Sequence, residues 1–145
     1  MYSFITSFLK NHLYLKKIKE NNYIFCNIRK KFVLFKGEEV TRQYIIFLLK
    51  SKKKYKNYNI SVEFPIYINK ICKRIDILVL NKKTPHIIIE CKSPYTKITQ
   101  KTFDQISMYN HSVNSPFLWI SNGIKSIIFK IDKSKKRYLF LKNIP

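Results

Sequence analysis

The chain has 145 residues, of which 46% are hydrophobic and 15% aromatic, so it can fold as one domain and wholesale disorder is excluded. No apolar run approaches the roughly 18 residues of a membrane-spanning helix, which argues against insertion into a bilayer. Twenty-nine basic and eight acidic residues give a net charge of +21, and an excess of this size attracts phosphate backbones and other anionic surfaces.

The positive charge is open to two interpretations. It is the electrostatic footprint expected of a nucleic-acid-binding protein. It is also what compositional drift produces when lysine fills surface positions that tolerate any polar residue, and this chain is rich in lysine, isoleucine and asparagine. The two interpretations have equal weight, so the charge by itself does not decide between them.

The cysteines and histidines form no recognisable disulfide or metal pattern. The three cysteines are odd in number and lack a CxxC spacing, which predicts free thiols in a reducing compartment. The three histidines are scattered, so a zinc site has little support. The opening residues, MYSFITSFLKNHLYLKK, lack the basic start of a signal peptide. These features together predict a cytoplasmic protein that is not associated with a membrane.

The chain is expected to begin with a lead-in segment over residues 1–22, followed by a single domain over residues 23–145. The domain opens with alternating residues on both sides of CNIRKK, which predicts a short hairpin over residues 23–35. A helix is predicted next, over GEEVTRQYIIFLLKSKKK. Glu38 and Glu39 suit the positive dipole of its first turn, and the lysine run suits its last turn.

Three strands are expected after this helix. The first is ISVEFPIYI, in which Pro65 indicates an edge strand, a bend or a bulge. The next two are ICKRIDILVL and HIIIECK, which the tight turn NKKTP joins into a hairpin. Asp76 lies inside the first strand of this pair, and Glu90 lies near the end of the second.

The remaining pattern predicts a second helix and closing strands. In TQKTFDQISMYNH, Phe103, Ile106 and Met108 mark one apolar face of a helix, and Thr99 or Thr102 could cap its start. PFLWISNG and IKSIIFKID are expected to pair through an Asn-Gly turn, and RYLFLKNIP is a last short strand or tail. This order of elements predicts an α/β fold, a mixed β-sheet flanked by helices.

Charged residues at the end of the third strand indicate a function. Residues two apart in a strand point to the same face, about 6–7 Å apart, so Glu90 and Lys92 share a face. Asp76 is expected to approach Glu90 from the neighbouring strand, and two converging carboxylates repel each other unless a cation lies between them. Oxygen ligands suit Mg²⁺, and a lysine beside the ion would neutralise charge on a phosphate. The pattern therefore indicates metal-dependent phosphate chemistry.

The order and spacing of RID and ECK resemble the signature of the PD-(D/E)xK nucleases, with Ile75 at the nominal proline. In order along the chain, EEVTRQ, KRIDILVL, PHIIIECKSP, TFDQISMYN and ISNG resemble the N-terminal nuclease domain of type I restriction enzyme R proteins, in particular its small stand-alone version. The resemblance covers about residues 22–145. It implies a restriction-endonuclease-like core with the order α-β-β-β-α-β behind an N-terminal hairpin.

The resemblance also implies roles for individual residues. Asp76 and Glu90 correspond to the metal ligands, and Lys92 corresponds to the catalytic lysine. Glu38 corresponds to the acidic residue of the first helix, which supplements the catalytic and metal site, and Glu39 takes its place if the register differs by one residue. Mg²⁺ is the implied cofactor, with Mn²⁺ as a substitute.

Nucleic-acid contacts are expected beside these residues. Gln105 and Tyr109 lie at i and i+4 on one helix face and match the family's QxxxY element, which borders the active site. Glu63 is expected to be solvated or paired, although it would face the same cleft. Several lysines could follow phosphates, although a solvated surface explains them equally well: Lys97, Lys101, Lys52, Lys53, Lys54 and Lys56.

The sequence thus predicts a Mg²⁺-dependent endonuclease that acts on DNA. The two glycines, Gly37 and Gly123, lie too far apart for a Walker-type phosphate loop, so an ATP-driven motor would belong to a separate protein. A homodimer is the other expected partnership. The alternative is a non-catalytic domain that keeps the nuclease fold and binds nucleic acid or docks on another protein. The complete set of expected ligands favours the enzyme.

Overall fold

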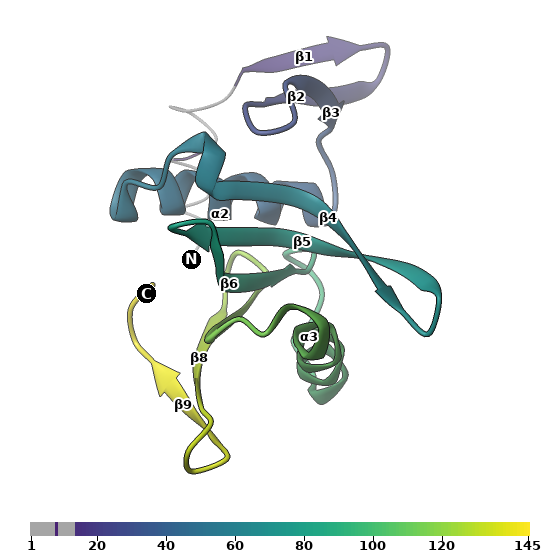
Figure 1. Ribbon diagram of the computed structural model, residues 1–145. Coiled ribbons are helices and arrows are strands. Elements are labelled where there is room, and N and C mark those ends of the chain that lie inside the picture. The colour runs from purple at the N-terminus through teal and green to yellow at the C-terminus, as the bar shows by residue number, and fades with distance from the viewer. Residues whose placement is uncertain (1–7, 9–13) are drawn as a thin grey trace.

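The computed structural model describes residue 8 and residues 14–145, which form two β-sheets and the helices that pack on them (Figure 1). The small sheet has the strand order β1-β2-β3, and the larger sheet has the order β4-β5-β6-β7-β8-β9. Only β6 and β7 pair in parallel, so the larger sheet is mixed, as predicted. The elements are β1 (Leu15–Ile18), β2 (Asn21–Cys26), β3 (Lys31–Leu34), α2 (Glu38–Lys53), the short 3₁₀ helix η1 (Asn57–Asn59), β4 (Ile60–Ile68), β5 (Ile71–Asn81), β6 (Thr84–Cys91), α3 (Gln100–Val113), β7 (Phe117–Ser121), β8 (Ser126–Asp132) and β9 (Arg137–Leu141).

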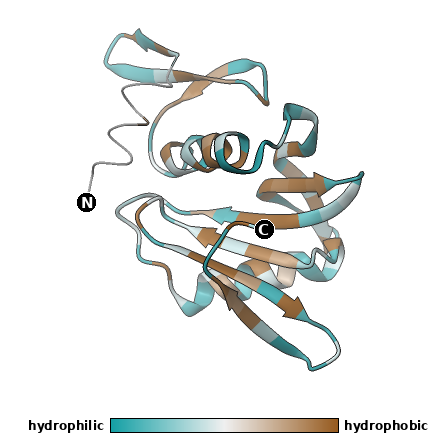
Figure 2. Cartoon of the chain, turned by 90° about the vertical axis from the view of Figure 1, so that its left-hand side faces the viewer, coloured by the Kyte–Doolittle hydropathy of each residue, from teal (hydrophilic) through white to brown (hydrophobic). Residues whose placement is uncertain are grey.

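Helix α2 lies between the two sheets, and helix α3 packs on the opposite face of the larger sheet (Figure 1). Strand β6 contributes to both faces, since Ile87 and Ile89 pack on the α2 side and Ile88 packs on the α3 side. A strand that is buried on both faces is apolar without interruption, which explains the run of three isoleucines. Figure 2 shows the hydrophobic residues concentrated along the strands of the larger sheet, with hydrophilic residues at the turns.

Strand β4 changes face in its middle. Ile60 and Val62 pack on the α2 side, whereas Ile66 and Ile68 pack on the α3 side. In a regular strand these residues would share one face, because they are all an even number of positions apart. The irregularity falls at Glu63, whose φ of 54° is a left-handed conformation that residues other than glycine rarely adopt. Of the three alternatives that Pro65 indicated, the edge position is confirmed, because β4 is the outermost strand, and the irregularity lies two residues before Pro65.

Strand β5 changes face at the matching position, Asp76. Ile75 packs in the cluster on the α3 side, and Ile77 packs in the cluster on the α2 side. The register pairs Val62 with Ile77 and Phe64 with Ile75, so Asp76 lies across from the irregular residue of β4. Asp76 therefore lies where the strand crosses from one face of the sheet to the other.

The hairpin predicted over residues 23–35 is present as β2 and β3, and strand β1 adds a third strand to it. Strand β1 falls within residues 1–22, the segment expected to be a lead-in; residues 1–7 and 9–13 lie outside the described residues. Phe8 is 4% exposed, and its ring lies 5.5 Å from that of Tyr44 and 5.3 Å from that of Phe47.

The remaining elements follow the predictions closely, with one error. Thr99 is the residue that precedes helix α3, as expected. Met108 does not belong to the buried face of this helix, because it is 43% exposed. Ile106 and Tyr109, three positions apart, form that face instead, and Met108 points away from it.

The three cysteines are free, as predicted. Within the described residues, no helix has both the length and the apolar surface needed to cross a bilayer.

Candidate active site

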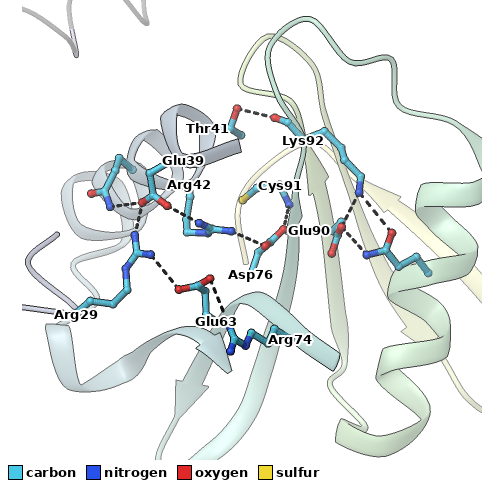
Figure 3. Close-up of polar contacts among 12 residues, drawn as sticks. Arg29, Glu39, Thr41, Arg42, Glu63, Arg74, Asp76, Glu90, Cys91 and Lys92 are labelled. Atoms are coloured by element: carbon cyan, nitrogen blue, oxygen red, sulfur yellow. Dashed lines mark hydrogen bonds and ion pairs between the residues drawn. The ribbon is translucent and has the colours of Figure 1, made fainter. Parts of the chain in front are cut away.

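Asp76 and Glu90 are neighbours at the end of the pairing between β5 and β6. The last paired residues before them are Ile77 and Ile89, so Asp76 and Glu90 are the next residues along the two strands. Beyond these last paired residues, the Asp76 side chain bonds the backbone of β6 in place of a strand-to-strand hydrogen bond. Its Oδ2 accepts a hydrogen bond of 2.7 Å from the backbone N–H of Cys91, and its Oδ1 accepts one of 2.7 Å from Arg42 (Figure 3). Both oxygens of the aspartate are thus held by fixed donors.

Glu90 points to the other side, toward helix α3. Its Oε1 accepts a hydrogen bond of 2.8 Å from Lys92 Nζ and another of 2.8 Å from Gln105 Nε2. Gln105 Nε2 also lies 3.3 Å from the hydroxyl of Tyr109. The structure therefore brings together Glu90, Lys92, Gln105 and Tyr109, as the sequence predicted. Within the described residues, Oε2 of Glu90 makes no hydrogen bond.

The charges around Glu90 are not balanced. Burial, followed by the charges of Asp76 and Glu38, raises the pKa of Glu90 to about 7, although Lys92 acts against this shift. Burial lowers the pKa of Lys92, but its hydrogen bond to Glu90 and the surrounding carboxylates outweigh burial and raise the pKa overall. Lys92 thus offsets only part of the effect that burial and the neighbouring carboxylates have on Glu90.

Glu38 and Glu39 point to different surroundings at the start of helix α2. Glu38 is exposed, and its charge acts on both Glu90 and Lys92. Glu39 is buried and makes ion pairs with Arg29 and Arg42. The assignment of Glu38 rather than Glu39 to the site stays a prediction.

A second polar cluster extends from Asp76 to the α2 side of the sheet. Arg42 bridges Asp76 and Glu39, and Gln43 donates a hydrogen bond of 2.8 Å to Glu39. Arg29, in the turn between β2 and β3, reaches the same glutamate. Arg29 also pairs with Glu63 at 3.1 Å, so the paired role expected for Glu63 is confirmed. Figure 3 shows this cluster from Arg29 to Asp76, on the opposite side of Asp76 from Lys92.

The basic residues lie at very different distances from the site. Lys97 and Lys101 are exposed on the segment between β6 and α3 and on the first turn of α3, beside the helix that carries Gln105. The lysine cluster that begins at Lys52 lies at the end of helix α2. That helix has 16 residues, about 24 Å at 1.5 Å per residue, and Glu38 is at its other end. The cluster at the end of α2 is therefore not part of the site.

The donor set fits a hydrated Mg²⁺ ion. Asp76 and Glu90 lie on neighbouring strands, close enough for the charge of Asp76 to act on Glu90, and one oxygen of Glu90 makes no hydrogen bond to the described residues. Mg²⁺ is usually held by one or two carboxylates and keeps several water molecules. Among the described residues, no three His, Cys, Asp or Glu side chains cluster closely enough to hold an ion, so the metal-ligand role of Glu38 stays a prediction.

Residues 37–145 match the family described as type I restriction enzyme R protein N terminus (HSDR_N). The chain belongs to this family. The family falls in the PD-(D/E)xK class of nucleases, so the resemblance is confirmed and the function is nuclease-related. No curated protein and no solved structure matches the chain.

The match to the restriction R protein family begins just before helix α2 and leaves out the small sheet. The resemblance of the hairpin segment to the family, from about residue 22, therefore lies outside the matched residues. Every predicted site residue falls inside the match, whereas Arg29 falls outside it.

Sequence reasoning missed the second cluster. The pairing of Glu39 with Arg42 had a signal, since the two are three positions apart in a helix and acids are scarce in this chain. The contacts of Arg29 had none, because they depend on how the small sheet packs on α2.

Proposed function

We propose that this chain is a nuclease that uses Mg²⁺ to hydrolyse the phosphodiester bonds of DNA. The observation that carries the proposal is the buried carboxylate of Glu90, which lies beside Asp76 and is bonded to Lys92 and Gln105. Burying a carboxylate beside a second carboxylate is costly unless a ligand uses them. Membership of a restriction enzyme family makes DNA the substrate to propose.

Asp76 and Glu90 would hold the Mg²⁺ ion, and Mn²⁺ could replace it. When bound, the ion supplies Lewis-acid stabilisation of the charge that develops on the phosphate. Lys92, whose raised pKa keeps it protonated at neutral pH, would act as a cation and hydrogen-bond donor toward a phosphate oxygen. It is poorly suited to accept a proton from water.

Residues around this centre would orient the ligands and the nucleic acid. Gln105 fixes the Glu90 carboxylate, and Tyr109, which is only 7% exposed, holds Gln105. In the proposal, Gln105 rather than the buried tyrosine ring would contact nucleic acid. Exposed Lys97 and Lys101 would contact phosphates on either side of the cleavage point.

Partner proteins belong to the same proposal. A type I restriction R protein domain implies an assembly with other subunits, so we propose that an ATP-driven motor, where one is needed, is a separate protein. A homodimer would let two sites cut both strands of a duplex. Light scattering of the protein with and without duplex DNA would separate these assemblies by mass.

Calorimetric titration of Mg²⁺ and Mn²⁺ into the purified protein tests the proposal, with Asp76→Asn beside it. Asp104→Asn is the matched control, because it removes an exposed carboxylate from helix α3 that, among the described residues, bonds only Gln100. We expect metal binding, and nicking of supercoiled or single-stranded DNA, to be lost in Asp76→Asn and kept in Asp104→Asn.

Circular dichroism would confirm that all three proteins are folded. Equal, weak metal binding by the wild type and Asp76→Asn, with no cleavage by either, would contradict the proposal. Metal and DNA binding without cleavage would instead support the non-catalytic alternative.

A further inference from the structure

A continuous chain of ion pairs connects the small sheet to Asp76. Arg29 donates to Glu39 and, at 3.1 Å, to Glu63, while its Nε donates to the Cys26 thiol at 3.3 Å. Glu39 also accepts a hydrogen bond from Arg42, whose second terminal nitrogen bonds Asp76 at 2.7 Å. Three successive ion pairs therefore link the side chain of Arg29 to Asp76 along this chain (Figure 3).

This chain of ion pairs is buried in its middle and half-buried at its two ends. Glu39 and Arg42 are each 7% exposed, and the side chains of Arg29 and Asp76 are 12% and 13% exposed. Buried ion pairs are weak evidence for stability, because well-packed apolar residues often serve the fold as well or better. A cluster of this kind calls for an explanation other than stability alone.

The geometry of Arg42 depends on its two carboxylate partners. One end of its guanidinium bonds Glu39 and the other bonds Asp76, while Nε is buried without a hydrogen-bond partner among the described residues. If Glu39 lost Arg29, its charge would attract Arg42 more strongly and draw the guanidinium away from Asp76. The position of Asp76 would then depend on the Cys91 amide alone.

We propose that Arg29, Glu39 and Arg42 are positioning residues for Asp76, so that the small sheet, outside the family match, supports the metal site. This inference rests on the proposed function for its consequence, which is metal affinity. The structural coupling itself is independent of any metal. The planar, two-ended guanidinium suits this task, because it can hold two carboxylates at once, which a lysine ammonium does not do with the same geometry.

The sign of the effect separates positioning from simple electrostatics. Removing a positive charge near a metal site should leave Mg²⁺ affinity unchanged or raise it, because the site becomes more negative. Losing a residue that orients a ligand should lower the affinity, and such changes typically cost 10- to 100-fold in metal affinity. A weaker affinity in a variant that has lost a cation is therefore specific to positioning.

The experiment compares Arg29→Gln with Arg74→Gln. Both arginines pair with Glu63, at 3.1 Å and 3.8 Å, but only Arg29 also reaches Glu39. Arg74→Gln therefore controls for the lost charge and for the lost contact with Glu63. Arg29→Lys is the second variant, since it keeps the charge and removes the planar fork.

Two measurements are made on each protein. The first, without metal, is hydrogen exchange at the Cys91 amide, which bonds Asp76, corrected for the free energy of unfolding. The second is the dissociation constant for Mg²⁺ by calorimetry. We expect faster Cys91 exchange and about tenfold weaker Mg²⁺ binding in both Arg29 variants, with no change in Arg74→Gln.

Exchange rates that match in the wild type and both Arg29 variants would overturn the inference, as would Mg²⁺ binding that is unchanged or tighter in both. If the wild type binds no Mg²⁺, the proposed function fails, and the exchange of Cys91 still decides whether Arg29 positions Asp76. The two failures are therefore distinguishable.

Discussion

The two sides of Asp76 contain similar groups in opposite electrostatic states. On the α2 side, the guanidiniums of Arg29 and Arg42 both pair with Glu39, and Arg42 also pairs with Asp76. On the α3 side, Lys92 is the one cation bonded to Glu90 among the described residues, and burial together with the charges of Asp76 and Glu38 raises the pKa of that glutamate to about 7. A balanced cluster has the properties of a scaffold, whereas an unbalanced one has the properties of a binding site.

The largest expected difference between the two sides of Asp76 is in the stability that is lost when one long side chain is replaced on each side. Arg42→Met leaves two buried carboxylates without their shared partner and should lower the free energy of unfolding by about 3–5 kcal/mol. Gln105→Met removes a neutral donor from a half-buried position and should cost about 1 kcal/mol. Urea unfolding followed by circular dichroism measures both.

Glu90→Gln serves as a control for that pair, since it removes charge from the α3 side without removing bulk. Equal losses of stability for Arg42→Met and Gln105→Met would mean that the α2 side is not the scaffold that its bonding suggests. A larger loss of stability for Gln105→Met would mean that the α3 side, and not the α2 side, is the scaffold.

The free energy of unfolding should depend on pH because of Glu90, on the α3 side of Asp76. The pKa of Glu90 rises from 4.5 to about 7 on folding, so the folded state holds a proton that the unfolded chain releases earlier. The stability that this proton brings is fully present below pH 4.5 and is lost as the pH rises through about 7. The loss should amount to no more than ~3 kcal/mol.

The measurement is the free energy of unfolding in EDTA from pH 4 to 8 for the wild type and Glu90→Gln, whose amide does not titrate. The free energy of unfolding of the wild type should fall relative to that of Glu90→Gln as the pH rises. A difference that stays constant with pH would show that Glu90 is not perturbed in the folded protein.

The sequence predicted one side of Asp76 far better than the other. Glu90 and Lys92 lie two apart on one strand, and Gln105 and Tyr109 lie four apart on one helix, so local periodicity placed them correctly. The same periodicities predicted most of the strands and helices. They work because the residues that share a face are close together in the sequence.

The α2 side depends on features that periodicity does not contain. Both β4 and β5 change face at Glu63 and Asp76, and a regular two-residue alternation would have sent their later residues to the wrong face. Arg29 reaches Glu39 only because the small sheet packs on α2, a contact set by tertiary structure.

The smallest expected effect concerns the lysines at the surface, which also differ between the two sides. Lys97 and Lys101 lie beside α3, whereas Lys52 and Lys53 lie at the far end of α2. Each phosphate contact contributes about 0.9 to the slope of log affinity against log salt concentration for duplex DNA. The double variant Lys97→Ala/Lys101→Ala should therefore lower the slope by about 1–2, and Lys52→Ala/Lys53→Ala, with the same change of charge, should leave it unaltered.

Fluorescence anisotropy of a labelled duplex, in EDTA and at several salt concentrations, measures both slopes without cleavage. Equal slopes for the two double variants would mean that the net charge of +21 attracts DNA to the whole surface, and that the lysines beside α3 have no special place. A lower slope only for the pair beside α3 would locate the DNA on the side of Asp76 where charge is unbalanced. Binding and proposed catalysis would then share one face, which is the arrangement a phosphodiesterase requires, since the nucleic-acid backbone has to pass over Glu90 and Lys92.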